Sequence, residues 1–158
     1  MQTLPRSAQR VQDSADHLGL DISVREMPES TRTAQEAADA CGCLIGQIVK
    51  SLIFQGADTA KAYLLLVSGA NRVDQVKMAT EIGEALTRPE ADFVRTVTGY
   101  AIGGVPPFGH AETLETFIDT DLLDHNQVWA AAGTPKCLFS VSPQALQHAI
   151  GARIISVG

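Results

Sequence analysis

The stretch Gln47-Ile48-Val49-Lys50-Ser51-Leu52-Ile53-Phe54 decides the fold, because its β-branched and large apolar residues predict a buried strand. Side chains alternate between the two faces of a strand, so Lys50 and Ser51 are expected on opposite faces. Lys50 shares its face with three apolar residues, Ile48, Leu52 and Phe54. Ser51 shares the other face with Val49 and Ile53. A second apolar run at 62–67 predicts the next strand.

Lys50 is out of place among these neighbours, because lysine is almost never fully buried without a partner. Two interpretations stay open. The side chain reaches solvent along its methylene stem, or its ammonium group lies at the floor of a pocket and faces an anionic or carbonyl group. A general base would need a strongly lowered pKa, which a sequence does not reveal. Ser51 is not expected to be a nucleophile, since it points away from the lysine's face.

The segment Gly103-Gly104-Val105-Pro106-Pro107-Phe108-Gly109 is too rich in glycine and proline for a helix or a central strand. It is also too apolar for a solvated linker. One interpretation is a tight structural turn. The other is a rigid loop whose backbone comes close to a ligand, so that N–H groups around Gly103, Gly104 and Val105 donate to a carbonyl or an oxyanion.

These segments belong to an ordered set of short motifs that runs from about residue 31 to residue 146. The motifs are Thr33-Ala34, Gly42, Gln47–Leu52, Ser68-Gly69, Thr98-Gly99-Tyr100, Gly103–Pro107 and Ala132-Gly133. The set resembles the YbaK and prolyl-tRNA synthetase-associated domain family of free-standing aminoacyl-tRNA deacylases (ProX-like) and editing domains. The resemblance implies a mixed, curved β-sheet with flanking helices (an α+β fold), in one editing domain over residues 1–158.

The same resemblance implies that Lys50 is needed for activity and that the Gly-x-x-x-Pro loop lines the amino-acid pocket. We expect catalytic roles for Lys50 and Gly104. The expected substrate-binding residues are Gly103, Val105, Pro107, Ser68, Ala132 and Gly133. For Ser68-Gly69, a plain turn is an equally good interpretation. The terminal ribose hydroxyls, or a water that they orient, are implied in place of a protein nucleophile.

The implied activity is hydrolysis of the ester bond of mischarged aminoacyl-tRNA, with tRNA(Pro) carrying a small amino acid such as alanine, serine or 2-aminobutyrate as the favoured substrate. Prolyl-tRNA synthetase is a possible partner. Two alternatives stay open: a non-catalytic module that binds a tRNA acceptor end or a synthetase, and a hydrolase of another small ester.

Charge and composition limit the partners. The net charge of −6 argues against broad nucleic-acid binding, which needs many phosphate contacts. This net charge does not forbid a local basic patch that binds a few terminal nucleotides, and Arg32 and Arg72 are its candidate residues. No apolar run approaches the ~20 residues that span a bilayer, and the N-terminus lacks a secretion signal, so we expect a cytoplasmic protein. The three cysteines form no zinc-binding spacing, and we expect no metal and no cofactor.

Strands and helices are interspersed without a regular βαβ repeat, which also predicts a mixed sheet. Helices are expected at about 7–18, 34–40, 73–82, 90–97 and 143–150, and further strands at about 22–26, 114–118, 128–132, 137–141 and 154–157. In the helix at 73–82, Val76 is expected to face inward. Asp119 is the best carboxylate candidate for chemistry, but a cap of the following helical turn is the favoured interpretation.

Overall fold

The computed structural model describes residues 3–158. Its centre is an antiparallel pair of strands, β2 (Ile48–Gly56) and β3 (Ala62–Ser68), which pair over seven positions from Val49↔Ser68 to Gln55↔Ala62. The predicted alternation along β2 is confirmed. Leu52 and Phe54 pack into one apolar cluster, and Val49 and Ile53 pack into another on the opposite face.

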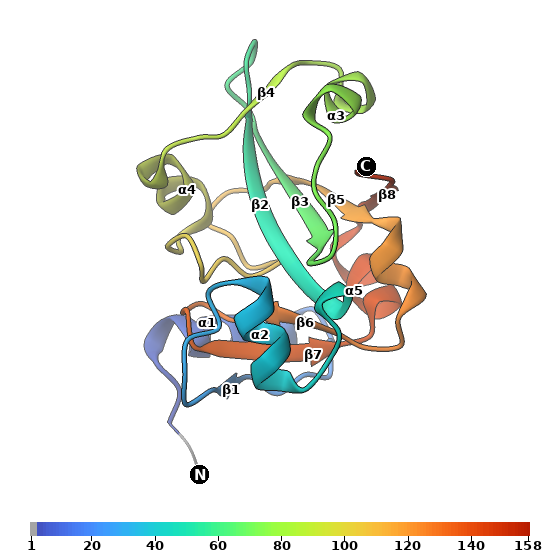
Figure 1. Ribbon diagram of the computed structural model, residues 1–158. Coiled ribbons are helices and arrows are strands. Elements are labelled where there is room, and N and C mark those ends of the chain that lie inside the picture. Colours follow the sequence, from blue (N-terminus) through green and yellow to red (C-terminus); the bar gives the residue numbers. More distant parts are fainter. Residues whose placement is uncertain (1–2) are drawn as a thin grey trace.

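Around this pair, the described residues form one eight-stranded mixed sheet, as the sequence predicts. Its order is β1-β7-β6-β2-β3-β5-β8, with β4 pairing with β2 (Figure 1). The remaining strands are β1 (Arg25–Glu26), β4 (Leu86–Thr87), β5 (Glu115–Asp119), β6 (Val128–Ala131), β7 (Cys137–Val141) and β8 (Arg153–Ile155). The β2–β6, β3–β5 and β5–β8 pairs are parallel and the others antiparallel. β2 and β3 rise steeply in Figure 1 whereas β6 and β7 run across it, so the sheet is strongly twisted.

Helices cover both faces of the sheet. They are α1 (Arg6–His17), α2 (Ala34–Cys41), α3 (Gln75–Ile82), α4 (Ala91–Thr98) and α5 (Pro143–Ile150), with short 3₁₀ turns η1 (Ile45–Gln47) and η2 (Thr120–Asp124). Figure 1 places α2 in front of β6 and β7, and α1 behind them. The clusters agree, because α2 packs Ala37 and Ala38 against Leu138, whereas α1 packs Val11 into the cluster of Phe139.

Several predicted helix ends are confirmed by their caps. Thr33 forms a capping box with Glu36, and Gly42 ends α2 in the left-handed conformation, φ +66°. Ser142 accepts a hydrogen bond from the N–H of Ala145, with Pro143 in the first turn. The side chain of Asp119 accepts a hydrogen bond from the N–H of Asp121, so it is the predicted cap of η2.

Other predictions need correction. Val76 was expected to face inward, but the residue is 81% exposed. Asp74 caps α3, so the helix begins at Gln75 and presents Met78 to the core instead. The strand expected at 22–26 is reduced to β1, because only two residues pair with β7. The sequence indicated neither the two-residue strand β4 nor the 3₁₀ turn η1.

One edge of β2 is open over part of its length. β6 pairs with β2 only at Ile48 and Val49, and β4 joins the same side only at Gln55 and Gly56. Between these contacts, residues 50–54 have β3 as their single partner strand within the described chain. In Figure 1, β6 and β7 run across β2, and β6 leaves it after two paired positions. The backbone of β2 beyond these positions borders a cavity.

Within residues 3–158, no helix is both long enough and apolar enough to cross a membrane.

Candidate active site

A cavity of about 300 Å³ lies beside the open edge of β2. Its walls come from the segment before α2, from β2, from the ends of β6 and β7, and from the glycine-rich loop. The lining residues include Thr31, Arg32, Thr33, Ala37, Ile48, Lys50, Ser51, Ile53, Arg88, Val94, Gly103, Val105, Ala131 and Leu138. Six consecutive residues of β2, 48–53, border it, so the cavity meets the strand from its edge and not from one face. Most of the lining is apolar, with three cationic side chains.

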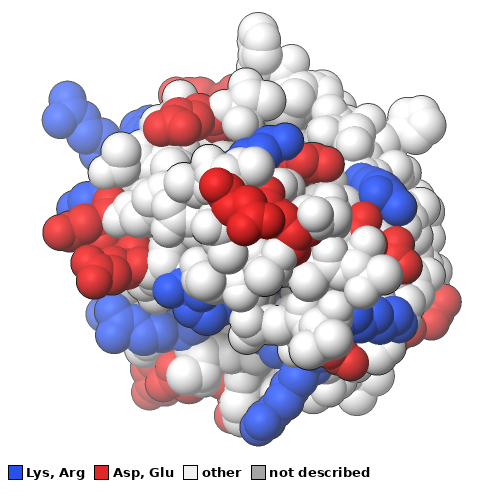
Figure 2. Space-filling view, turned by 90° about the horizontal axis from the view of Figure 1, so that it is seen from above, with Lys and Arg blue, Asp and Glu red and all other residues white. Residues whose placement is uncertain are grey.

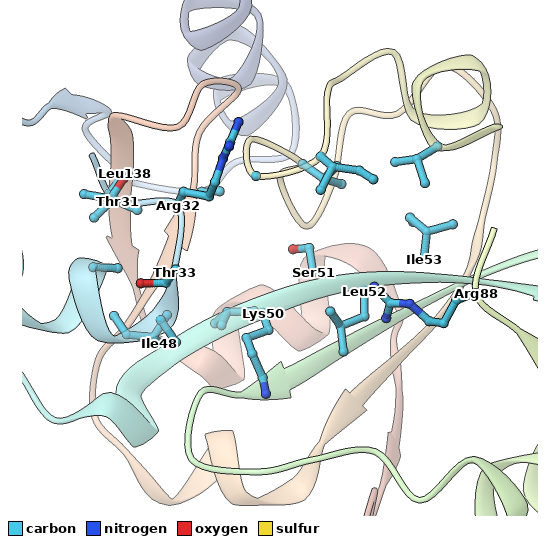
Figure 3. A pocket seen from close by; sticks show the side chains of 18 of the residues that line it. Thr31, Arg32, Thr33, Ile48, Lys50, Ser51, Leu52, Ile53, Arg88 and Leu138 are labelled. Atoms are coloured by element: carbon cyan, nitrogen blue, oxygen red, sulfur yellow. The ribbon is translucent and has the colours of Figure 1, made fainter. Parts of the chain in front are cut away.

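Lys50 lines the cavity, but its ammonium group lies on the far side of β2 from the hydroxyl of Ser51 (Figure 3). The Nζ atom donates a short hydrogen bond to the main-chain carbonyl of Asn71. Burial lowers the pKa of Lys50, and the positive charge of Arg72 lowers it further, while the carboxylate of Asp119 acts in the opposite direction. The lysine is therefore held in place as a donor, in surroundings that weaken its hold on the proton.

The turn that receives Lys50 is fixed by Asp119. This carboxylate is almost completely buried. It accepts hydrogen bonds from the N–H of Ser68 (3.1 Å), from the Nδ2 of Asn71 (2.8 Å) and from the N–H of Asp121 (3.0 Å). Asp119 therefore orders the turn whose Asn71 carbonyl accepts the hydrogen bond from Lys50, in addition to its electrostatic effect on that lysine.

Ser51 points to the cavity side of β2, toward the space between Arg32 and the glycine-rich loop (Figure 3). Its Oγ atom is buried and has no hydrogen-bond partner among the described residues. Buried hydroxyl groups in native proteins are nearly always paired, so this one stands out as a group without its partner. The alternation that places Ser51 opposite Lys50 is as predicted, and the cavity reaches the face of Ser51 as well as the strand edge.

The glycine-rich loop is held rigidly by its neighbours. The N–H of Gly104 donates to the carbonyl of Ala101 (3.0 Å), and the carbonyl of Gly104 accepts from the N–H of Gly133 (2.9 Å). A Cβ on Gly104 would lie 2.8 Å from the carbonyl carbon of Gly133, so only glycine allows the two backbones this approach. The Nε2 of His110 lies 2.7 Å from the carbonyl of Pro106. Burial lowers the pKa of His110, which favours a neutral ring that donates to this carbonyl.

These hydrogen bonds divide the N–H groups of the loop into those with and those without a main-chain acceptor. That of Gly104 is already used inside the loop, whereas those of Gly103 and Val105 have no main-chain acceptor among residues 3–158. Gly103 and Val105 also line the cavity. The predicted donors are therefore better represented by Gly103 and Val105 than by Gly104, whose place in the structure is the contact with Gly133.

Two arginines add charge to the rim. The side chain of Arg32 lies over Gly103, where its Nε would be 3.1 Å from a Cβ. Arg88, which no sequence pattern singled out, lines the cavity and stacks over Phe54 with its Cζ 5.0 Å from the ring centre. On the face seen in Figure 2, Lys and Arg side chains are scattered among Asp and Glu. The basic groups relevant to a nucleic acid are thus these local ones.

The predicted site residues divide into two groups. Lys50, Gly103, Val105 and Arg32 come together around the cavity. The remaining residues, Gly104, Pro107, Ser68, Ala132, Gly133 and Arg72, are not among the described residues that line it. Ser68 uses its Oγ to donate to the carbonyl of Gly46 (2.8 Å), as a structural turn would. Contact of this second group with substrate stays a prediction.

Comparison with known proteins assigns this architecture. The model of the aminoacyl-tRNA editing domain matches residues 28–149, which include β2, the cavity and the glycine-rich loop. The chain belongs to this editing-domain family. The uncharacterized protein YwhH of Bacillus subtilis (strain 168) is 30% identical over 125 residues, covering 79% of each protein.

Solved structures carry the same fold. One, named as the crystal structure of a candidate trans-editing enzyme for prolyl-tRNA synthetase, is 47% identical over 98% of each chain, with a TM-score of 0.92. Another, of the hypothetical protein APE2540, is 30% identical, covers 94% of this chain and 98% of its own, and has a TM-score of 0.87. The resemblance stated from the sequence motifs is thereby confirmed.

Proposed function

We propose that this editing-domain chain hydrolyses the ester bond of mischarged aminoacyl-tRNA, and that its substrate is tRNA(Pro) carrying a small non-cognate amino acid. The single observation that carries the proposal is the cavity between the open edge of β2 and the loop at Gly103–Val105, with Lys50 on its wall. Its volume of about 300 Å³ suits a small side chain and the ester beside it, and the whole of a tRNA acceptor end would extend past the rim.

The chemistry needs little machinery, because an aminoacyl ester is intrinsically labile. The protein has to orient the ester, stabilise the developing oxyanion and admit water. Gly103 and Val105 have N–H groups available for the oxyanion. Lys50 is proposed to act as a cation toward the carbonyl or the terminal phosphate, because its Nζ is engaged as a donor. Arg32 and Arg88 are proposed to hold the nucleotide end at the rim.

The substrate preference rests on the apolar walls of the cavity. Val94, Val105 and Ile53 line the cavity together with Ser51. One methylene more or less in such a pocket changes the free energy of discrimination between substrates by about 1–3 kcal/mol. We propose alanine, serine and 2-aminobutyrate as the removed amino acids. The similarity to a candidate trans-editing enzyme for prolyl-tRNA synthetase supports tRNA(Pro) and that synthetase as the partners.

The experiment is a deacylation panel with tRNA(Pro) charged with alanine, serine, threonine, cysteine, 2-aminobutyrate and proline. Free aminoacyl methyl esters serve as the comparison. Turnover of one or two small non-cognate charges, with proline spared and free esters slow, is the expected result. Equal turnover of tRNA-linked and free esters would replace the proposal with a general small-ester hydrolase. Binding of charged tRNA without turnover would replace it with a binding module.

A further inference from the structure

The direction of the backbone groups along β2 follows from its end contacts. The carbonyl of Ile48 accepts a hydrogen bond from the N–H of Gly69 (2.7 Å), and the N–H of Gly56 donates to the carbonyl of Lys61 (2.8 Å). Both bonds run toward β3. Because backbone groups alternate along a strand, the even-numbered residues of β2 direct their N–H and C=O groups to β3.

The odd-numbered residues direct theirs to the other edge. Consistent with this, the carbonyl of Gln55 accepts from the Oγ1 of Thr87 on the β4 side (3.1 Å). Ser51 and Ile53 lie in the gap where neither β6 nor β4 pairs with β2. Their N–H and C=O groups therefore point from an unpaired strand edge into the cavity that both residues line.

Ser51 concentrates three polar functions at this edge. Its N–H and C=O face the gap, and its buried Oγ, directed to the same cavity, lacks a partner among the described residues. An exposed strand edge is a template for pairing with an added strand. The cavity is too small to admit a peptide strand along the whole gap. It has room for a single residue that carries one hydrogen-bond donor and one acceptor.

We propose that the aminoacyl group of the substrate pairs with Ser51 as a single added strand residue. Its α-ammonium group donates to the carbonyl of Ser51, and its ester carbonyl accepts from the N–H of Ser51. An aminoacyl ester presents a donor and an acceptor with the spacing of one residue, as an antiparallel hydrogen-bonded pair requires. The inference rests on the proposed function, because it describes how that substrate is held.

The pairing has two consequences. Side chains of directly opposed residues lie on the same face, so the amino acid's side chain would sit beside the Oγ of Ser51, against Val94 and Val105. The N–H of Ser51 would become a further donor to the oxyanion, next to those of the glycine-rich loop. Ser51 would then bind the reacting group without acting as a nucleophile.

Amide hydrogen exchange tests the pairing directly. The probe is 3′-deoxy-3′-(L-alanylamino)adenosine, in which a stable amide replaces the ester. Binding is expected to slow exchange of the Ser51 amide at least about tenfold. Lys50 and Leu52, whose amides face β3, are the internal controls and should not change. Probe binding that leaves the Ser51 amide unprotected, or no binding at millimolar probe, would overturn the inference.

Two variants separate the backbone from the hydroxyl. Ser51→Ala removes Oγ alone. Ser51→Pro also removes the N–H, which bonds no strand within residues 3–158, so its loss is tolerable at a strand edge. Removing one oxyanion donor typically lowers kcat about 10²–10³-fold. We expect Ser51→Pro to lose at least about 100-fold in kcat on alanyl-tRNA(Pro), and Ser51→Ala less than about tenfold, with folding checked by circular dichroism.

The outcomes distinguish the pairing at Ser51 from the proposed hydrolytic function. Equal activity of Ser51→Pro and Ser51→Ala, in folded protein, would refute the pairing and leave the proposed function standing. Absence of hydrolysis by the wild type on every charged tRNA would refute the proposed function itself. The exchange experiment supplies its result in either case, since it needs binding and not turnover.

Discussion

Lys50 and Ser51 are adjacent in the chain, but their side chains point to opposite sides of β2. The ammonium group of Lys50 donates to the carbonyl of Asn71, on a turn organised by Asp119. The hydroxyl of Ser51 points to the cavity beneath Arg32 and has no hydrogen-bond partner in the described part of the chain (Figure 3). The edge of the strand lies between them. A substrate that reaches both residues must cross that edge, where neither β6 nor β4 pairs with the backbone of β2.

The pH dependence of activity should report the charge on Lys50. Burial and Arg72 lower its pKa, so the fraction of ammonium form falls as pH rises through a value below that of an ordinary lysine. If the cation is the active form, the rate of deacylation divided by the spontaneous rate should decline at alkaline pH. The measurement is a pH–rate profile under single-turnover conditions.

Lys50→Arg is the matched variant for that profile, because a guanidinium group does not titrate in this range. Its residual activity should lack the alkaline decline. A wild-type rate that instead climbs through the same range, beyond the spontaneous rate, would show that the neutral amine acts as a base and that the cationic role is wrong.

Asp119→Ala should destabilise the protein and reduce activity together. The substitution leaves the buried N–H of Ser68 without an acceptor, which costs about 1–3 kcal/mol in free energy of unfolding for one such group. It also frees the turn of Asn71 that holds Lys50. Urea unfolding measures the first effect and deacylation by the folded variant the second.

Asp121→Ala is the control for this change, since its carboxylate accepts from the same Asn71 side chain (2.7 Å) at an exposed position. The Asp121→Ala variant should lose far less free energy of unfolding than Asp119→Ala. A stable, fully active Asp119→Ala variant would show that the turn is held without this carboxylate.

Gly104→Ala should lower stability through a backbone collision. The new Cβ would meet the carbonyl carbon of Gly133 at 2.8 Å and the nitrogen of Thr134 at 2.9 Å, and neither belongs to a flexible side chain. Overpacking of this kind costs about 1–3 kcal/mol, and each kcal/mol lowers Tm by roughly 2–4 °C in a chain of this size. Gly46→Ala, whose Cβ would come no closer than 3.5 Å to its neighbours, is the control. Similar Tm values for the two variants would contradict the close approach.

Arg32→Ala should weaken tRNA binding in a salt-dependent way. If Arg32 contacts a phosphate at the rim, its loss removes one released counterion, and the slope of log K against log salt should become shallower by about 0.7–0.9. Binding titrations at several salt concentrations measure the slope. The control is Arg153→Ala, because Arg153 lies on β8 and pairs with Glu81 of α3. An unchanged slope for Arg32→Ala would remove Arg32 from the phosphate contacts.

Much of the fold was predictable because its signals are local. The alternation along β2, the capping box of Thr33 and the Ser142-Pro143 helix start each depend on residues that are close in the chain, and each is confirmed. Val76 was misplaced because the register of a short helix depends on its cap, Asp74, and not on apolar residues alone.

The site was predictable in its parts and not in its arrangement. Lys50 and the loop at Gly103–Val105 stand out by composition, and they do line one cavity. The open edge of β2 depends on where β6 leaves the strand, about eighty residues later, and no local pattern reports that. Alternation separated Ser51 from the lysine correctly. It did not show that the cavity wraps the strand edge and reaches both residues.

The most direct test of the central claim is single-turnover deacylation of alanyl-tRNA(Pro) by the wild type, Lys50→Ala and Lys61→Ala. Lys61 is an exposed lysine that pairs with Glu115 and does not line the cavity, so it is the matched control. Rapid hydrolysis by the wild type and Lys61→Ala, reduced about 100-fold or more in Lys50→Ala, is the predicted result. Equal rates for the three proteins, or no hydrolysis above the spontaneous rate, would contradict ester hydrolysis at this cavity.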